Sequence, residues 1–94
     1  MKFIFEWDEN KAERNVQKHA VSFQEAATVF RDELSVTFSD ETHSTDEERF
    51  IDIGRSANGQ VLIVVYTERK DVIRIISCRK ATRAERKTYE NQTD

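Results

Sequence analysis

Two apolar runs in the second half of the chain constrain its fold more than any other feature. Residues 61–66 are apolar throughout, and residues 72–78 form a second run in which Arg74 is the one charged residue. Apolar runs of this length are typical of central strands that are buried on both faces. Asn58-Gly59 is a hairpin signal that joins the first run to an expected strand at residues 48–53. The sequence therefore predicts a sheet in which consecutive strands pair.

Shorter patterns predict the first half of the chain. Apolar and polar residues alternate at residues 2–7 and at residues 34–38, which indicates two further strands. Two helices are expected between them. Asp8 is a suitable N-cap for the first helix, and Ser22 and Glu25 have the capping-box spacing that opens the second.

Thr82 and Glu85 repeat the capping-box spacing and place a last helix from Arg83 to about residue 91. The chain order is then β-α-α-β-β-β-β-α. Because the last four strands follow one another closely, we expect an α+β fold with an antiparallel sheet and with the helices packed on one of its faces. The opposite face of the sheet would be partly open.

Length and composition limit the class of protein. With 94 residues, the whole chain, 1–94, is expected to be a single domain. No apolar stretch reaches the roughly 18 residues of a membrane span, and the charged first residues do not resemble a signal peptide. The single cysteine, Cys78, fits a reducing compartment and gives no support to a Cys/His zinc site. We expect a cytoplasmic protein that has no bound metal and no cofactor.

The net charge of −3 hides an uneven distribution of charge along the chain. Residues 69–87 hold eight Lys and Arg against two acidic residues, Asp71 and Glu85. A basic segment in an acidic chain is typical of nucleic-acid binding, and RNA is the partner that we expect. The alternative is a solvent-exposed helix face with ion pairs.

Arg74 lies in the middle of an otherwise apolar strand, where a charge is unfavourable unless it is paired or faces water. It could form an ion pair with Glu48, Asp52 or Glu68 on a neighbouring strand. It could instead face an open surface and grip a phosphate group with its guanidinium fork. The sequence leaves both interpretations open.

Arg79, Lys80 and Arg83 follow at the end of the same strand and at the start of the last helix. Backbone N–H groups at a helix N-terminus attract anions, so these cations form a candidate phosphate site. Tyr89 lies about two turns further on and could stack on a base or pack against the sheet. Solvated charge is again the alternative.

Cleavage of RNA without a metal requires a base, an acid and cations that stabilise the phosphorane. The titratable candidates are His43, Glu48, Tyr66, Glu68 and Tyr89. For His19, at the end of the first helix, a capping or packing role is favoured over catalysis. The sequence shows no nucleophile triad, glycine-rich phosphate loop or paired-carboxylate motif.

Three blocks of the sequence resemble the BrnT toxin family. They are residues 5–26, with Asn15-x-x-Lys18-His19; residues 43–54, with Glu48-Arg49-Phe50-x-x-Ile53-Gly54; and residues 74–90, with Arg74-Ile75-Ile76-Ser77-x-Arg79 and Tyr89-Glu90. Together they cover nearly the whole chain and are specific as a set. The family often has glycine after the Lys-His pair, where this chain has Ala20, a poor residue for a left-handed C-cap.

The resemblance implies a RelE-like ribonuclease fold and a toxin that inhibits translation by cutting RNA. It also implies a BrnA-like antitoxin of the ribbon-helix-helix type, through which alone operator DNA would be contacted. Carried over by position, the catalytic residues would be Arg49, Arg74 and Arg79, with Glu48 and His43 as further candidates.

The sequence thus supports the hypothesis of a metal-independent endoribonuclease. A second hypothesis is a non-catalytic module that binds an antitoxin and acts as co-repressor, and it predicts no growth arrest when the chain is expressed alone. A third is a structural domain with solvated charges, and it predicts that neither RNA nor a protein partner binds.

Overall fold

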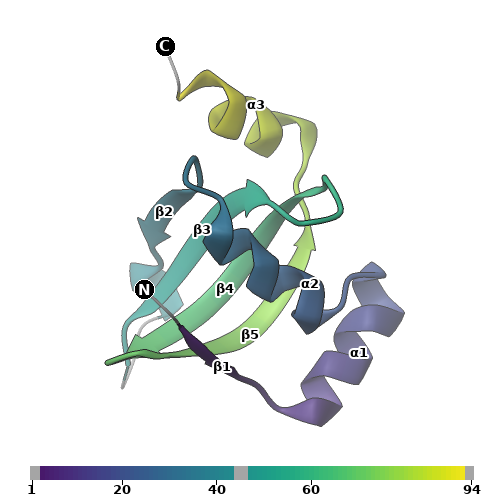
Figure 1. Cartoon of the computed structure of the whole chain (residues 1–94), viewed down its shortest axis with the longest axis vertical. Helices are drawn as coiled ribbons and strands as arrows, with labels where there is room; N and C mark the ends of the chain where they lie inside the picture. Colours follow the sequence, from purple (N-terminus) through teal and green to yellow (C-terminus); the bar gives the residue numbers. More distant parts are fainter. Residues whose placement is uncertain (1–2, 44–46, 93–94) are drawn as a thin grey trace.

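A computed structural model of the chain describes residues 3–43 and 47–92, and within them five strands form one sheet with three α-helices around it (Figure 1). The strands are β1 (Ile4–Glu6), β2 (Val36–Ser39), β3 (Arg49–Arg55), β4 (Val61–Arg69) and β5 (Val72–Lys80). The helices are α1 (Glu9–His19), α2 (Phe23–Thr28) and α3 (Arg83–Asn91), with short 3-10 turns η1 (Val29–Arg31) and η2 (Glu41–His43). None of the described helices is long and apolar enough to cross a membrane.

The sheet is mixed, so the expectation of an antiparallel sheet is wrong for one strand. The strand order is β1-β5-β4-β3-β2, and β2 to β5 pair antiparallel. β1 lies parallel to β5, with Glu6 opposite Arg74. The reason is the connection: after β1, the chain passes through α1 and α2 and enters the sheet at its far edge. β1 and β5 are therefore not joined by a short turn. Since only a short turn requires two paired strands to be antiparallel, β1 can pair parallel to β5.

The larger core lies between the sheet and the first two helices. Alternate residues of a strand point to opposite faces, and Leu62, Val64 and Tyr66 of β4 belong to one buried cluster with Phe23 of α2 and Val29 of η1. Figure 1 shows α2 crossing this face of the sheet and α1 lying beside it along β5. We call this side the core face.

α3 packs on the opposite face, so the expectation that all helices share one face is wrong for this helix. Ile53, Val61 and Ile63, which alternate with the core-face residues, form a second buried cluster with Tyr89 of α3. Ala81, just after β5, packs against the same cluster. The chain therefore turns over the end of the sheet, and α3 covers only that end (Figure 1).

A β-bulge in β5 decides which side chains share the uncovered part of this face. Ser77 pairs with Val65 whereas Ile75 pairs with Tyr66, so Ile76 is an extra residue. We call the part of this face that no described helix covers the open face; its residues are Ile4, Glu6, Phe38, Arg49, Ile51, Val65, Thr67, Arg69, Val72, Arg74, Ser77 and, at the border with α3, Arg79.

The helix ends are largely those that the sequence predicts. The Asp8 carboxylate accepts hydrogen bonds from the N–H groups of residues 10 and 11 at 2.8 and 3.1 Å, and Thr82 and Glu85 form a complete capping box. Ser22 caps α2, but the carboxylate of Glu25 binds Ser56 at 2.6 Å and not the N-cap. The hairpin between β3 and β4 is also longer than a two-residue turn, since it spans residues 56–60.

Asn15 of α1 completes the edge of β5 beyond the short strand β1. Its side chain accepts a hydrogen bond from the Cys78 N–H at 3.2 Å and donates to the Cys78 carbonyl at 2.9 Å. It also donates to the Val21 carbonyl at 2.9 Å. Asn15 is buried, so an amide side chain here takes the place that a neighbouring strand would have.

Candidate functional site

A row of polar side chains crosses the open face from strand to strand. Arg49, Thr67 and Arg74 are consecutive partners on β3, β4 and β5, and Glu6 of β1 continues the row. Partners in one row point to the same face, and strands two apart are separated by about 10 Å. Two arginines thus flank Thr67 on a part of the sheet that no described helix covers.

Arg74 forms an ion pair, and its partner is Glu6. The distance from its Nη1 to the Glu6 Oε2 is 3.1 Å, and the side chains are 48% and 50% exposed. None of the three partners considered from the sequence, Glu48, Asp52 and Glu68, is the one found. Because half of each side chain stays in water, the pair fixes the direction of Arg74 without shutting it off from a ligand.

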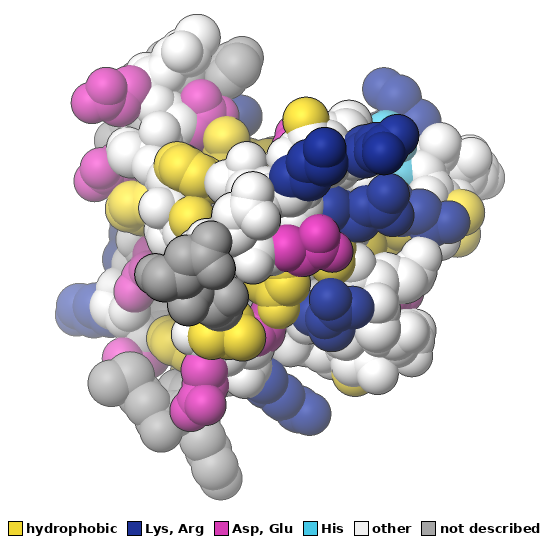
Figure 2. Space-filling model, turned by 90° about the horizontal axis from the view of Figure 1, so that it is seen from above, with side chains coloured by type: hydrophobic (Ala, Val, Ile, Leu, Met, Phe, Trp, Pro, Cys, Tyr) yellow, Lys and Arg dark blue, Asp and Glu magenta, His cyan; other side chains and the backbone are white. Residues whose placement is uncertain are grey.

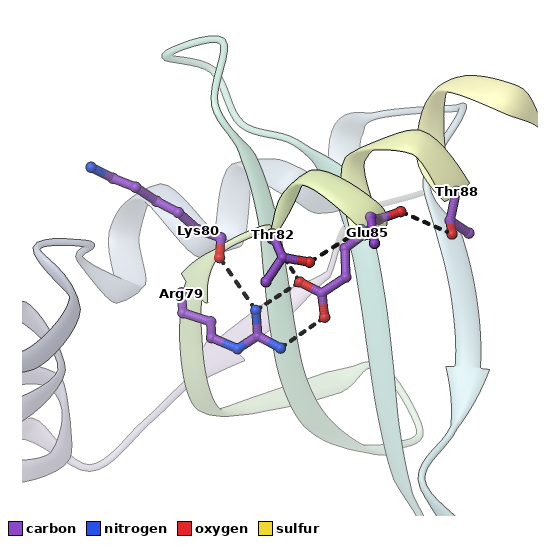
Figure 3. Close-up of polar contacts among 6 residues, drawn as sticks. Arg79, Lys80, Thr82, Glu85 and Thr88 are labelled. Carbon is purple, nitrogen blue, oxygen red and sulfur yellow. Dashed lines mark hydrogen bonds and ion pairs between the residues drawn. The ribbon is translucent and has the colours of Figure 1, made fainter.

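Arg79 is held by two hydrogen bonds to Glu85 of α3, with N–O distances of 2.8 and 2.9 Å (Figure 3). The same carboxylate accepts a hydrogen bond from the Thr82 N–H at 2.8 Å. These hydrogen bonds, that of Arg79 first, hold the pKa of Glu85 at about 2, although partial burial acts in the opposite direction. The pair raises the pKa of Arg79. The guanidinium is therefore a fixed positive charge at the border of the open face.

Arg74 and Arg79 share this face but do not lie side by side. They are five positions apart, which on a regular strand would place them on opposite faces. The extra residue Ile76 brings both to the open face. Along β5 they are still about 15 Å apart, given about 3.3 Å per residue. Both remain accessible, and each has a carboxylate partner.

The candidate acid–base groups lie elsewhere. Glu48 comes just before β3, and its carboxylate accepts a hydrogen bond from the Ser39 hydroxyl at 3.4 Å. His43 ends η2, and its side chain lies outside the described residues. Tyr66 is buried on the core face and donates to Asp52 at 2.9 Å. Burial, first of all, raises the pKa of Tyr66. Glu68 pairs with the core-face position Ile73 and is not on the open face.

Tyr89 cannot serve as a stacking platform for a base in this arrangement. Its side chain is 6% exposed within the second core cluster. Its hydroxyl donates to Asp32 Oδ2 at 2.6 Å, and burial followed by this hydrogen bond raises the pKa of Tyr89. Of the two roles considered from the sequence, packing against the sheet is the one found, and the expectation that Tyr89 stacks on a base is wrong.

Lys80 and Arg83 line a groove between α3 and the turn that joins β3 to β4. Its volume is about 460 Å³, and Arg55, Arg86 and Lys87 also line it. The side chain of Lys80 points away from Arg79, on the other side of β5 (Figure 3). We call this feature the α3 groove.

A second set of basic side chains, on α1, is not among the sites predicted from the sequence. Lys11, Arg14, Lys18 and His19 line a hollow of about 290 Å³ beside Ser77 at the rim of the open face. The signal was the spacing i, i+3, i+7 of the first three, which places them on one helical stripe. Seen from the α3 end, Lys and Arg side chains gather on the side where Figure 1 shows α1, whereas acidic side chains are more frequent on the other side (Figure 2). The described residues contain no cluster of metal-ligating side chains.

Comparisons with known proteins identify the family to which the chain belongs. A sequence profile described as "Ribonuclease toxin, BrnT, of type II toxin-antitoxin system" matches residues 7–85. The chain belongs to the BrnT family. It is also similar to the crystal structure of the Brucella abortus ribonuclease toxin BrnT, with a TM-score of 0.66 and 20% sequence identity over 87% of this chain and 100% of that one. A search of curated proteins finds no significant match.

The family resemblance predicted from the sequence is thus confirmed, and the likeness to the Brucella BrnT structure shows the same α+β fold. BrnT proteins are ribonuclease toxins of type II toxin–antitoxin systems. An RNA target and an antitoxin partner follow from membership of this family.

Proposed function

We propose that this BrnT-family chain is a metal-independent endoribonuclease that inhibits translation by cutting RNA. A BrnA-like antitoxin of the ribbon-helix-helix type would neutralise it in the cytoplasm, and the complex would contact operator DNA only through the antitoxin. The observation that carries the catalytic part is the row of Arg49, Thr67, Arg74 and Glu6 on the open face of the sheet. It combines fixed positive charge with a carboxylate in reach of solvent.

The reaction that fits these groups is transfer of the phosphoryl group to the neighbouring 2′-oxygen. The 2′-oxygen bonds to phosphorus and the bond from phosphorus to the 5′-oxygen breaks, which gives a 2′,3′-cyclic phosphate and a 5′-hydroxyl. One proton leaves the 2′-hydroxyl and one reaches the 5′-oxygen. The extra negative charge on the pentacovalent phosphate is what cations must stabilise.

Arg49 and Arg74 supply that charge from two sides of Thr67, and a guanidinium can bind two phosphate oxygens at once. Arg79 lies further along β5 and binds the neighbouring part of the RNA chain. Lys11, Arg14 and Lys18 on α1 extend the positive surface along the rim of the open face. The polyanion therefore finds cations on β3, β5 and α1.

Three groups are candidates for proton transfer. Glu48 and His43, which the family resemblance suggests, lie on either side of residues 44–47. Glu6 is added by the structure, because its carboxylate lies 3.1 Å from Arg74 on the open face. A general base must lie within hydrogen-bond reach of the proton that it removes. To identify the base, each of the three residues is replaced by Gln and the rate is measured as a function of pH. The general base is the residue whose replacement removes the fall in rate at low pH.

The test measures cleavage of a single-stranded RNA in EDTA by the wild type, by Arg74→Ala and by Arg31→Ala. Arg31 is an exposed arginine on η1, outside the open face. We expect Arg74→Ala to lose about 10²–10³ in rate, as for removal of one group that stabilises the charged transition state, and the control to keep its activity. Equal rates for both variants would remove Arg74 from the mechanism, and loss of wild-type cleavage in EDTA would refute metal independence.

Expression of the chain in growing cells, with and without an adjacent antitoxin gene, tests the biological part. We expect growth arrest and loss of protein synthesis with the chain alone, and recovery when the antitoxin is present. Normal growth with the chain alone would instead indicate the non-catalytic antitoxin-binding module.

A further inference from the structure

The α3 groove has a strong excess of positive charge. Its charged lining residues come from three elements: Arg55 from the end of β3, Lys80 from the end of β5, and Arg83, Arg86, Lys87 and Glu90 from α3. Among the described lining residues, five are therefore basic and one is acidic. The catalytic row on the open face includes none of them.

The arrangement of cations on α3 is unfavourable for the isolated protein. Arg83, Arg86 and Lys87 are spaced i, i+3 and i+4, so their side chains are neighbours and repel one another. Arg83 also lies in the first turn, where the helix dipole disfavours a positive charge. An anionic ligand in the groove would relieve both effects.

Arg55 is oriented before any ligand binds. Its Nη1 donates a hydrogen bond to the Gly59 carbonyl at 3.0 Å. Its guanidinium also lies over the ring of Tyr89, 5.7 Å from the ring centre. A side chain held on two sides loses little conformational freedom on binding, so this wall of the groove is preorganised for a ligand.

The groove is connected to the open face around the end of β5. Arg79 and Lys80 are adjacent residues that point to opposite sides of the strand (Figure 3). Arg79 borders the open face, and Lys80 lines the groove. A chain of phosphates that binds Arg79 can therefore continue around the end of β5 to Lys80 and Arg83.

We propose that the α3 groove is a second binding site for the sugar–phosphate backbone of the RNA, outside the site of cleavage. The proposal rests on the proposed ribonuclease function. It adds that the protein binds a longer stretch of RNA than the part at the site of cleavage. Affinity for a nucleic-acid backbone needs little beyond neutralising cations. A docked protein segment relies on buried apolar anchors. The apolar side chains among the described lining residues are Val61, which is buried, and Ala81. The groove therefore suits RNA better than an acidic protein segment.

The experiment measures binding of two single-stranded RNAs, one of about five nucleotides and one of about twenty, to the full chain. The substrates carry 2′-deoxy sugars at the cleavage position so that they are not cut. The test variant is Arg86→Gln with Lys87→Gln. Arg31→Gln, which removes a charge from an exposed position outside both the groove and the open face, is the control and is matched by the single variant Arg86→Gln.

We expect the test variant to lose tenfold or more of the preference of the wild type for the longer RNA. The slope of log Kd against log salt for that RNA should fall by about 1.4, that is about 0.7 for each lost phosphate contact. The control should keep the preference and the slope of the wild type.

A test variant that behaves like the control overturns the proposal. So does a test variant that binds both RNAs like the wild type but loses binding to the antitoxin, since the groove would then be a protein-binding surface. Failure of the proposed function is distinct from both outcomes, because the wild type would then fail to cleave the same RNAs when they carry ordinary ribose at every position.

Discussion

Glu85 binds both terminal nitrogens of Arg79, at 2.8 and 2.9 Å, while it also accepts a hydrogen bond from the backbone of Thr82. One carboxylate thus orients an arginine at the border of the open face and caps the N-terminus of α3. The orientation of a functional cation and the start of a helix depend on the same group.

This sharing predicts a specific dependence of stability on pH. The folded-state pKa of Glu85, about 2, is lower than its ordinary value of 4.5. Its contribution to stability is therefore complete above about pH 4.5 and is lost as the pH falls towards 2. For a partly exposed pair we expect about 1 kcal/mol, or a few degrees in Tm, between the wild type and Glu85→Gln at pH 7.

Thermal unfolding of both proteins from pH 7 to pH 2 checks this expectation. The two Tm values should approach each other below pH 4. A difference that stays constant down to pH 2 would mean that the charge of Glu85 does not stabilise the fold.

Ala20 offers a site where one substitution should stabilise the protein. It follows α1 with φ 59° and ψ 30°, in the left-handed region that alanine adopts at a cost. We expect Ala20→Gly to raise the free energy of unfolding by about 0.5–1 kcal/mol, after allowance for the greater freedom of glycine in the unfolded chain. Ala84→Gly, at an exposed helical position in α3, is the control and should lower it by a similar amount. Urea denaturation at pH 7 measures both, and a destabilised Ala20→Gly variant contradicts the prediction.

Asn15 should be among the residues on which the fold depends most. Asn15→Ala leaves the N–H and C=O groups of Cys78 without their partner at a buried edge. At about 1–3 kcal/mol for each buried unsatisfied group, we expect a loss of about 2–4 kcal/mol in the free energy of unfolding. Gln17→Ala, at an exposed position of the same helix, should change it by less than about 0.5 kcal/mol. Similar unfolding midpoints for the two variants would show that water replaces Asn15.

Gly54 lies where a side chain has no room. A Cβ at this position would lie 2.7 Å from the Val29 Cγ1 and 3.0 Å from the Ser35 Cβ. We expect Gly54→Ala to cost about 1–3 kcal/mol through overpacking. In combination with Val29→Ala the cost should fall, because the nearest contact is removed, and a double-mutant cycle measures this coupling. Additive effects would indicate that the backbone of β3 shifts instead.

A structural feature can be predicted from this sequence when the interacting residues are close together in the chain. The caps formed by Asp8 and Thr82 are local, because a side chain binds a backbone group two or three residues away, and the structure confirms both. The family resemblance is a further signal, carried by the whole chain. The direction of β1 is a non-local property, because it depends on where the chain re-enters the sheet after two helices.

The candidate site also depends on features that the sequence does not reveal. Alternation along residues 72–80 cannot reveal that Ile76 is an extra residue, yet this bulge alone brings Arg74 and Arg79 to one face. Nor could the sequence decide between the two roles of Tyr89, because the choice depends on Asp32, far away in the chain. The stripe of cations on α1 could have been found from its spacing, but its position beside Ser77 required the tertiary structure.

The position of β5 between β1 and β4 has a consequence for how the protein can be divided. The last strand separates the first strand from all the others, so no fragment that stops before residue 72 gives β1 a neighbour to pair with. The same strand carries Arg74 and Arg79, two of the three arginines on the open face that we assign to binding of the RNA. A product of incomplete translation or of proteolysis that lacks β5 is therefore expected to misfold and to have no toxic activity. We expect toxic activity only from a nearly complete polypeptide.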